Sequence, residues 1–393
     1  MESTMASTPR LDILLYAHDG RGLGHASRTI AVGMALRRLF PHLRVLFLSG
    51  GSMAQELIGP APLDWIKLPS YATIVENGTS RGSRGKSNFE DNELGHLRAQ
   101  QIRQTVRTYR PRLVLADHSP QGKHKELLPA LEDGEHEDTQ WILGMRGVVG
   151  QVGQVRSPLA ATTYQRFYSS LLWYGDSRVL GTRQLEEIQA HLGSTPLECG
   201  YASRMKEWRH TSAAARNTAI TGTISVPWFG EQTPVLLQRL HAGMRQTRNQ
   251  GGQWHLYLDN THPQSADFAA LFAGLPGCRV EAPGRRYMDS FLQSRCAIIY
   301  GGYNSLMDVL SLSMPAIVLL RGMQDQEQQY HLEKLLQAGG NMLTPLPENS
   351  TRQDLATALA SLRSPRREAD VAINLDGAAA AAHHLAAMLN TPR

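Results

Sequence analysis

The chain has 393 residues, of which 41% are hydrophobic and 19% are charged, a composition typical of globular proteins and unlike that of disordered or fibrous ones. Its 40 Lys and Arg exceed its 35 Asp and Glu by five, a surplus too small to indicate a nucleic-acid-binding face by itself. The three cysteines, Cys199, Cys278 and Cys296, form no CxxC pair, which argues against a disulfide framework or a structural zinc site and favours a reducing compartment.

The N-terminus and the hydropathy of the chain bear on its location. The first ten residues are polar and lack the apolar segment of a signal peptide. No stretch approaches the roughly 18 apolar residues that span a bilayer. We therefore expect a cytoplasmic protein without a transmembrane segment, for which peripheral contact with the inner membrane face stays open.

Short β-rich runs alternate with helical segments in the first half of the chain. A helix is expected at 25–40, after a glycine-rich turn. The expected strands lie at 12–17, 44–49, 113–116, 141–145 and 178–181. Strands that are apolar throughout and separated by helices indicate a parallel sheet covered on both faces. This pattern predicts a Rossmann-like N-terminal domain over residues 1–198.

The same pattern restarts after a less regular segment, which we interpret as a linker at 199–217. The following expected strands lie at 218–221, 254–259, 278–281, 296–300 and 316–320. They predict a second Rossmann-like domain over 218–370, with a helical tail at 371–393. The length of the chain agrees with this division, since about 150 residues per domain allow two or three domains. In such doubly wound α/β domains, ligands bind outside the carboxyl ends of the strands, so the cleft between the two domains is the expected site.

Residues 71–92 interrupt this alternation, because they are rich in Gly, Ser and charge and include Arg81, Arg84 and Lys86. We expect a long polar loop here. A loop of this length inside a compact domain is either functional or a solvated flexible connection.

The first segment that could carry chemistry is the glycine-rich turn with Gly22 and Gly24, which is followed directly by His25. Glycines let a backbone approach a ligand closely, and the first turn of a helix offers N–H groups. No acidic residue ends the next strand, which argues against an NAD site. The positive end of the helix dipole would lower the pKa of His25 and keep it a neutral base. A capping or packing role is the alternative.

Asp117 closes the strand expected at 113–116, which brings it to the same sheet edge as His25. A histidine that acts as a general base benefits from an orienting carboxylate. We therefore predict a His25–Asp117 pair. His118 and Asp19 are competing partners, and a purely structural Asp117 is the alternative.

A second glycine turn, Gly301 and Gly302, lies between a strand and a helix in the second half of the chain. Asn304 or Ser305 is expected to cap this helix, whose N–H groups would form an anion site suited to a diphosphate. Asp308 lies one turn further and could hydrogen-bond a ribose. An ordinary capped helix is the alternative.

In this order and spacing, the segments resemble the two-domain GT-B glycosyltransferases. The similarity is to the branch that includes the peptidoglycan N-acetylglucosaminyltransferase (glycosyltransferase family 28) and uncharacterised bacterial relatives. It covers nearly the whole chain and is most specific in its C-terminal part. The segments that carry it are HDGRGLGHASR at 18–28, CGYASR at 199–204, GGYNSLMD at 301–308, the stretch from Pro315 to Arg321, and Glu327-Gln328.

The resemblance implies a metal-independent, cofactor-free hexosyl transfer with inversion, from a nucleotide sugar, most simply a UDP-sugar, to an acceptor hydroxyl or other nucleophile. His25 matches the histidine that sits beside the acceptor hydroxyl in related inverting enzymes. The C-terminal domain would bind the donor. The residues implied for the donor are Gly222, Thr223, Tyr287, Met288, Gly301, Gly302, Asn304, Ser305, Asp308, Glu327 and Gln328.

Each group of donor residues has an implied partner. Gly222 and Thr223 would lie in a loop after the first strand of the domain, near the phosphates. Tyr287 and Met288 would flank the base. Asp308 stands where relatives have a Glu on the ribose, and Glu327 and Gln328 would contact the sugar hydroxyls.

The N-terminal domain would bind the acceptor, through Gly22 and Gly24 and, by charge, through Arg81 and Arg84. These cations favour an anionic small molecule or a lipid-linked acceptor. The alternatives are a nucleotide-sugar epimerase or hydrolase on the same fold and a non-catalytic nucleotide-sugar binder. Nucleic-acid binding ranks behind them, because only the basic stretch supports it, and no nucleic acid is expected as a partner.

Overall fold

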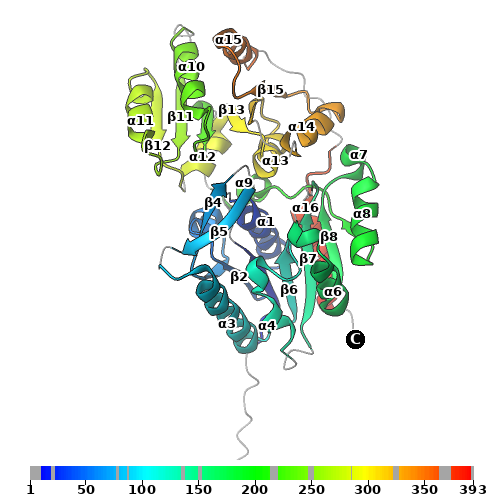
Figure 1. Ribbon diagram of the computed structural model, residues 1–393. Coiled ribbons are helices and arrows are strands. Elements are labelled where there is room, and N and C mark those ends of the chain that lie inside the picture. Colours follow the sequence, from blue (N-terminus) through cyan, green and yellow to red (C-terminus); the bar gives the residue numbers. More distant parts are fainter. Residues whose placement is uncertain are drawn as a thin grey trace, which may run out of the picture. The chain divides into compact units, whose positions relative to one another are not determined.

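The computed structural model describes residues 10–18, 23–76, 79–85, 88–133, 138–148, 153–212, 220–246, 252–284, 286–321, 327–362 and 373–390, without the side chains of 72–76, 79–85, 153 and 154. The chain forms two compact units. Unit 1 comprises Met1–Gly175, Gly181–Ala202 and Asp376–Arg393, and unit 2 comprises Asp176–Leu180 and Ser203–Leu375. Each unit is an α/β fold built around a parallel sheet (Figure 1). None of the described helices is both long and apolar enough to cross a membrane.

Unit 1 contains a parallel sheet in the order β3-β2-β1-β6-β7-β8-β9. Its strands are β1 (Ile13–Ala17), β2 (Val45–Ser49), β3 (Asp64–Lys67), β6 (Leu113–Asp117), β7 (Gln140–Arg146), β8 (Tyr168–Tyr174) and β9 (Leu197–Glu198). Its helices are α1 (Gly24–Leu39), α2 (Ala54–Ile58), α3 (Asp91–Tyr109), the 3₁₀ turn η1 (Lys123–Lys125), α4 (Leu128–Leu131), α5 (Gly153–Arg156), α6 (Pro158–Phe167), α8 (Arg183–Leu192) and α16 (Gly377–Asn390).

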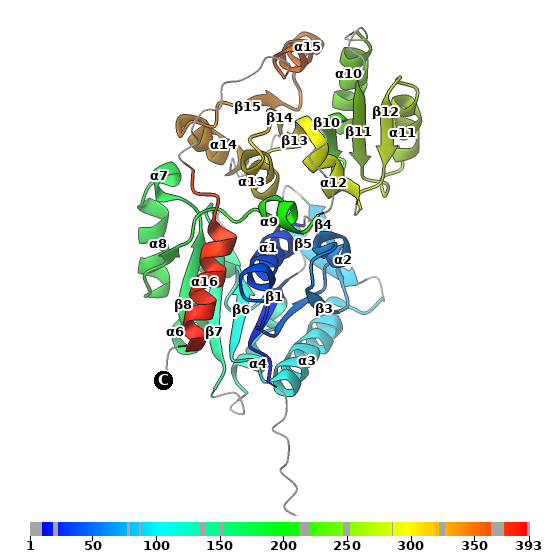
Figure 2. The same cartoon turned by 180° about the vertical axis from the view of Figure 1, so that it is seen from behind.

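The strand order of unit 1 reverses between β1 and β6, which pair in parallel from Ile13–Leu113 to Tyr16–Ala116. Every residue of β1 is at most 1% exposed, as expected for an apolar strand between two helical layers. Helices α1 and α16 lie side by side on one face of the sheet (Figure 2), and α4 and α6 cover the other (Figure 1). The β1/β6 edge is a topological switch point, the place where open α/β sheets bind ligands.

Unit 2 contains a second parallel sheet in the order β12-β11-β10-β13-β14-β15. Its strands are β10 (Ile220–Val226), β11 (Gln253–Leu258), β12 (Cys278–Glu281), β13 (Ser294–Tyr300), β14 (Ala316–Leu320) and β15 (Leu343–Pro347). Its helices are α7 (Ser177–Leu180), α9 (Arg204–Thr211), α10 (Thr233–Gln246), α11 (Ser265–Ala273), α12 (Arg286–Gln293), α13 (Tyr303–Ser311), α14 (Glu327–Gln337) and α15 (Arg352–Ser361). Here the order reverses between β10 and β13, so this sheet has its own switch point.

Three expected elements differ from the structure. Residues 178–181 were expected to form a strand, but residues 178–180 belong to helix α7. The Asp176 carboxylate caps the start of this helix, because it accepts a hydrogen bond from the Arg178 N–H at 3.0 Å. The strand of this region is β8 instead. The expected loop at 71–92 contains an antiparallel hairpin of β4 (Tyr71–Glu76) and β5 (Thr79–Gly85), whose backbones pair with each other. The expected linker at 199–217 contains helix α9.

The expected C-terminal tail forms part of unit 1, because α16 packs along α1. The Gly377 N–H donates to the Tyr201 carbonyl at 3.0 Å, and a Cβ at position 377 would lie 2.2 Å from the Gly200 carbonyl oxygen. Because backbone cannot move aside as a flexible side chain can, Gly377→Ala is expected to destabilise the protein by about 1–3 kcal/mol.

Urea unfolding of Gly377→Ala measures this cost. Gly284→Ala is the matched control, since its Cβ would approach the Ala282 oxygen only to 3.9 Å, and we expect it to stay within about 0.5 kcal/mol of wild type. Equal stability of Gly377→Ala and wild type would contradict the close docking of α16.

Candidate functional site

A histidine and a carboxylate meet at the switch point of unit 1. His25 is the second residue of α1, and Asp117 is the last residue of β6. The Nδ1 atom of His25 lies 2.5 Å from Oδ2 of Asp117. The structure therefore brings the predicted pair together, while its catalytic role stays a prediction. Gly24 begins α1 beside His25, and Gly22 and Asp19 lie outside the described residues.

Arg28 holds the other side of the same carboxylate, a contact that the sequence analysis missed. Its Nη2 atom lies 2.8 Å from both carboxylate oxygens of Asp117, and its Nε lies 3.1 Å from Oδ1. Both side chains are only 2% exposed. Arg28 stands three residues after His25, and residues with this spacing share one face of a helix, so the spacing was a usable signal.

These contacts select one form of the imidazole. Asp117 accepts from the His25 Nδ1–H, which leaves the Nε2 lone pair available to take a proton. Burial is the main cause that lowers the pKa of His25 well below its usual value, and the nearby His18, Arg28, Arg146 and Lys123 lower it further. The Arg28 guanidinium balances the charge of Asp117, so this carboxylate orients the ring without making it a strong base.

Two more histidines surround His25. The ring centroids of His18 and His118 lie 3.9 Å and 5.1 Å from that of His25. Burial also lowers the pKa of His118 well below its usual value. The backbone of His118 has a φ of 73°, a conformation that non-glycine residues rarely adopt and that is concentrated at functional sites. His25 is 22% exposed, whereas His118 is buried, so His25 is the ring that a ligand can reach.

The switch point of unit 2 holds the second glycine turn. Gly301 and Gly302 follow β13, and Gly302 is the N-cap of α13. The expectation that Asn304 or Ser305 caps this helix is therefore wrong; both lie half-buried in its first turn. A Cβ at Gly302 would meet nothing within 4 Å, so space is open at the start of α13.

Helix α14 begins beside these glycines with Glu327 and Gln328, both half-buried. The Cβ of Gln328 lies 3.7 Å from the position of a Cβ on Gly301. The Oε1 atom of Gln328 is buried and has no hydrogen-bond partner among the described residues. Gly301, Gly302 and Gln328, which the sequence analysis assigned to the donor, thus form one cluster.

Asp308 has a structural role that the sequence analysis missed. It is 4% exposed, and its Oδ1 accepts from the Ser203 hydroxyl at 3.0 Å and from the Met205 N–H at 3.1 Å. Burial raises the pKa of this carboxyl group, and the nearby Arg204 opposes the shift. Asp308 therefore binds the start of α9, and its role as a ribose ligand stays a prediction.

Other predicted donor residues lie in the protein interior. Gly222 and Thr223 are inside β10 rather than in a loop after it, because the strand continues to Val226. A Cβ at Gly222 would lie 2.5 Å from the Trp254 ring, and the Thr223 hydroxyl bonds that of Ser294 at 2.8 Å. The predicted phosphate loop at these residues is therefore wrong.

The pair expected beside the base is divided between interior and partly exposed positions. Met288 is 1% exposed, so its side chain lies in the protein interior, and its contact with a base stays a prediction. Tyr287 is half-buried, and its ring packs edge-on against Tyr257 with centroids 5.2 Å apart. Arg81 and Arg84 lie in β5, and their side chains are outside the described part of the chain.

A cluster of buried polar and aromatic side chains around Arg321, at the carboxyl ends of several unit 2 strands, was also missed. Arg321 directly follows β14, stacks on Tyr300 at 3.8 Å, and donates from Nη2 to the Trp228 carbonyl at 2.7 Å. Glu348, which follows β15, accepts from the Tyr300 hydroxyl at 2.8 Å and from the Thr233 hydroxyl at 2.6 Å. These contacts hold the loop after β10 at the switch point.

Comparisons with known proteins identify the fold. No protein-family model and no curated protein sequence matches the chain. Several solved structures match the chain. One is MurG from Acinetobacter baumannii, with a TM-score of 0.51 and 12% identity over 97% of this chain and 99% of that one. A putative UDP-N-acetylglucosamine 2-epimerase from Listeria monocytogenes, at 12% identity over 96% of both chains, has a TM-score of 0.64.

The UDP-GlcNAc 2-epimerase from Neisseria meningitidis, bound to UDP-GlcNAc, matches at 9% identity over 96% of this chain and 99% of that one, with a TM-score of 0.59. At these identities the likeness shows the fold alone. The fold class predicted from the sequence, two Rossmann-like α/β domains of the GT-B type, is confirmed.

Proposed function

We propose that the chain is an enzyme that acts on a nucleotide sugar and transfers the sugar to an acceptor, with His25 as the general base. The observation that carries this proposal is the Arg28–Asp117–His25 arrangement at the switch point of unit 1. The solved structures of the same fold support the substrate class, since one is a UDP-GlcNAc 2-epimerase bound to UDP-GlcNAc. A UDP-sugar is accordingly the first donor to test.

In the proposed step, the acceptor oxygen attacks the anomeric carbon from the side opposite the nucleoside diphosphate. The acceptor proton passes to Nε2 of His25, which Asp117 orients through Nδ1. The diphosphate leaves with the electron pair of the broken C–O bond, and the configuration at the anomeric carbon inverts.

The donor is proposed to bind unit 2 at Gly301, Gly302 and Gln328. The N-terminal end of α13 would stabilise the negative charge of the leaving diphosphate, so the proposal requires no metal ion. The buried Oε1 of Gln328 would accept a hydrogen bond from a sugar hydroxyl. On the acceptor side, Gly24 lies next to His25, which leaves the backbone accessible there.

An epimerase acting at C2 is the second candidate, favoured by the solved structures of this fold that carry that activity. Inversion at C2 must break the C2–H bond, whereas transfer leaves it intact. We expect UDP-GlcNAc incubated with the protein in D₂O without acceptor to keep its C2 proton in ¹H NMR spectra. Deuterium at C2 would establish the epimerase instead.

Transfer itself is tested by the release of UDP from UDP-sugars. We expect release by wild-type protein only when a polar or lipid extract supplies the acceptor, and a much slower release by His25→Ala under the same conditions. A non-catalytic binder would bind the nucleotide sugar and release no UDP in either case.

The pH dependence of transfer follows from His25. A base with a pKa well below 6.5 stays neutral as the pH falls from 8 to 6.5, so the rate is expected to hold over this range and to fall only well below it. Arg28→Gln removes a positive charge that lowers this pKa and leaves Asp117 to stabilise the protonated ring. The acid limb of its pH–rate profile is therefore expected to move to higher pH than that of wild type. A wild-type acid limb at 6.5, or no movement in Arg28→Gln, would contradict this electrostatic account.

A further inference from the structure

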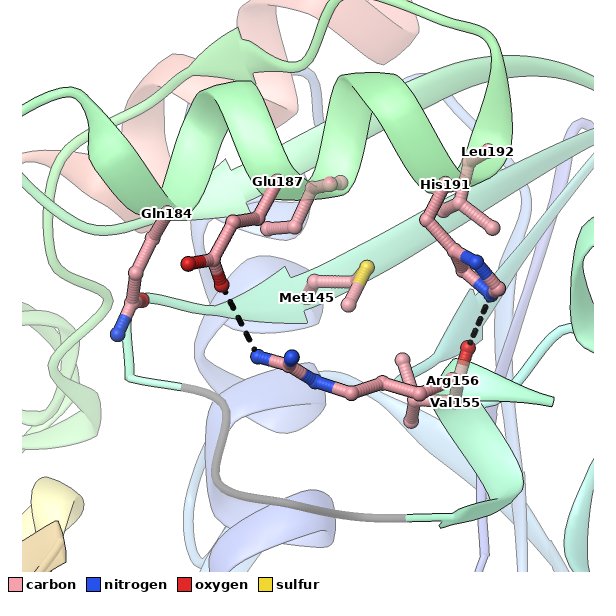
Figure 3. A pocket seen from close by; sticks show the side chains of 8 residues that line it. Met145, Val155, Arg156, Gln184, Glu187, His191 and Leu192 are labelled. Atoms are coloured by element: carbon pink, nitrogen blue, oxygen red, sulfur yellow. Dashed lines mark hydrogen bonds and ion pairs between the residues drawn. The ribbon is translucent and has the colours of Figure 1, made fainter.

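Unit 1 contains a pocket of about 280 Å³ that the proposed reaction has not used (Figure 3). Its walls are formed by Met145 near the end of β7, Val155 of α5, and Ile188 and Leu192 of α8. Except at its rim, the lining is therefore apolar. Apolar cavities of about 150 Å³ stay dry and bind a benzene ring, so this volume holds an aromatic ring with a substituent.

One polar atom of the pocket lacks a partner. The Oε1 atom of Gln184 is buried and accepts no hydrogen bond from any described residue. Figure 3 shows this amide at one end of the pocket, with the oxygen on the pocket side. A buried carbonyl oxygen without a donor is unfavourable, and an O–H or N–H on a ligand in the pocket would satisfy it.

The rim of the pocket is charged and held in place. Arg156 Nη2 lies 3.2 Å from one carboxylate oxygen of Glu187, and Arg183 Nε lies 3.0 Å from the other. These three side chains carry a net charge of one positive. The His191 ring N–H donates to the Val155 carbonyl at 3.1 Å, which fixes α5 on α8 and keeps the pocket formed without a ligand.

The pocket lies close to the sheet edge at which His25 and Asp117 meet. Gly144 of β7 pairs with Asp117 of β6, so Met145 lies one residue beyond the register of the catalytic carboxylate on the neighbouring strand. Arg146, the next residue, is close enough to His25 to affect its charge. Met145 in the pocket wall and Asp117 beside His25 therefore lie at the same end of neighbouring strands.

We propose that this pocket binds an apolar ring that carries one hydrogen-bond donor, of the phenol or indole type, and that this ring belongs to the acceptor. The assignment of the ring to the acceptor rests on the proposed function; the binding of the ring does not. The apolar walls hold the ring, and the Gln184 oxygen accepts from its O–H or N–H.

The test compares two probes of similar size, titrated by ¹⁹F NMR against the full-length protein: 4-fluorophenol, which carries an O–H donor, and 4-fluorotoluene, which carries a methyl group in its place. Wild type is expected to bind the phenol about tenfold more tightly, because only the phenol satisfies the buried oxygen. Gln184→Met, which keeps the length of the side chain and removes the acceptor, is expected to lose the preference for the phenol. Gln189→Met makes the same change at an exposed position of α8 and is expected to keep the tenfold preference.

A filling variant, Ile188→Phe, is expected to weaken both probes at least tenfold, with its folding checked by thermal unfolding. Equal binding of the two probes by wild type, or a preference that survives in Gln184→Met, would overturn the proposal. If the ring binds as expected and no sugar transfer is found, the proposed function fails and the pocket assignment stands. If transfer is found and the ring does not bind, only the pocket assignment fails.

Discussion

His25→Ala is expected to lower the rate of sugar transfer by about 10²–10⁴-fold, the range that a positioned general base contributes. The substitution removes the Nε2 lone pair that would receive the acceptor proton. It is expected to leave the fold intact, because the buried Asp117 carboxylate keeps its contacts with Arg28. Nucleotide-sugar binding is expected to be unchanged, since the proposed donor residues lie in unit 2.

The measurement is the steady-state rate of UDP release together with the dissociation constant of the UDP-sugar for each variant. His96→Ala is the matched control, because it removes an exposed histidine from α3 of the same unit, and its rate is expected to equal that of wild type. A His25→Ala protein that transfers sugar at the wild-type rate would show that another group takes the proton.

Arg98→Met is expected to destabilise the protein by about 3–5 kcal/mol, the usual cost of removing one partner from a buried ion pair. Arg98 Nε lies 2.5 Å from Oε2 of Glu126, and its Nη2 lies 2.9 Å from Oε1, with both side chains fully buried. The Tyr16 hydroxyl donates to the same carboxylate. Without Arg98 the Glu126 carboxylate would remain inside the protein without its cationic partner.

Urea unfolding of Arg98→Met measures this loss, and α3 supplies the control. Arg103 of the same helix pairs with Asp133 at 2.9 Å but is 38% exposed, so Arg103→Met is expected to cost at most about 1 kcal/mol. The double variant Arg98→Met/Glu126→Leu is expected to recover much of the lost stability, because the buried charge is gone. Similar losses for the two single variants would contradict the buried ion pair.

Much of the fold could be predicted because buried parallel strands are apolar along their whole length, as in β1, β2 and β6. β8 was missed because Ser169 and Ser170 interrupt its apolar run, and the carboxylate of Asp176 starts a helix where a strand was expected. The β4–β5 hairpin was missed for another reason. The residues of β5 are polar and glycine-rich and form a strand by pairing with β4, which hydropathy does not record.

Part of the candidate site could likewise be predicted from the sequence, and part of it could not. His25 and Asp117 could be paired from the sequence, because Asp117 ends β6 and His25 begins the helix that follows the neighbouring strand β1, next to the switch point. The role of Asp308 could not be predicted. In the sequence, a carboxylate one turn into a helix is equally compatible with a contact to a ribose and with a cap on another helix. The contacts of Arg321 with Trp228, and those of Glu348 with Tyr300, join strand ends far apart in the chain, and only the folded sheet brings them together.

The central claim, that this chain binds and uses a nucleotide sugar, is tested most directly by thermal unfolding with a panel of UDP, dTDP, GDP and their sugars. A ligand that binds only the folded protein stabilises it by about 2.7 kcal/mol at 100 times its dissociation constant. We expect at least one nucleotide or nucleotide sugar, UDP-linked first, to raise the unfolding temperature of wild type and His25→Ala equally. No rise with any member of the panel would contradict the account.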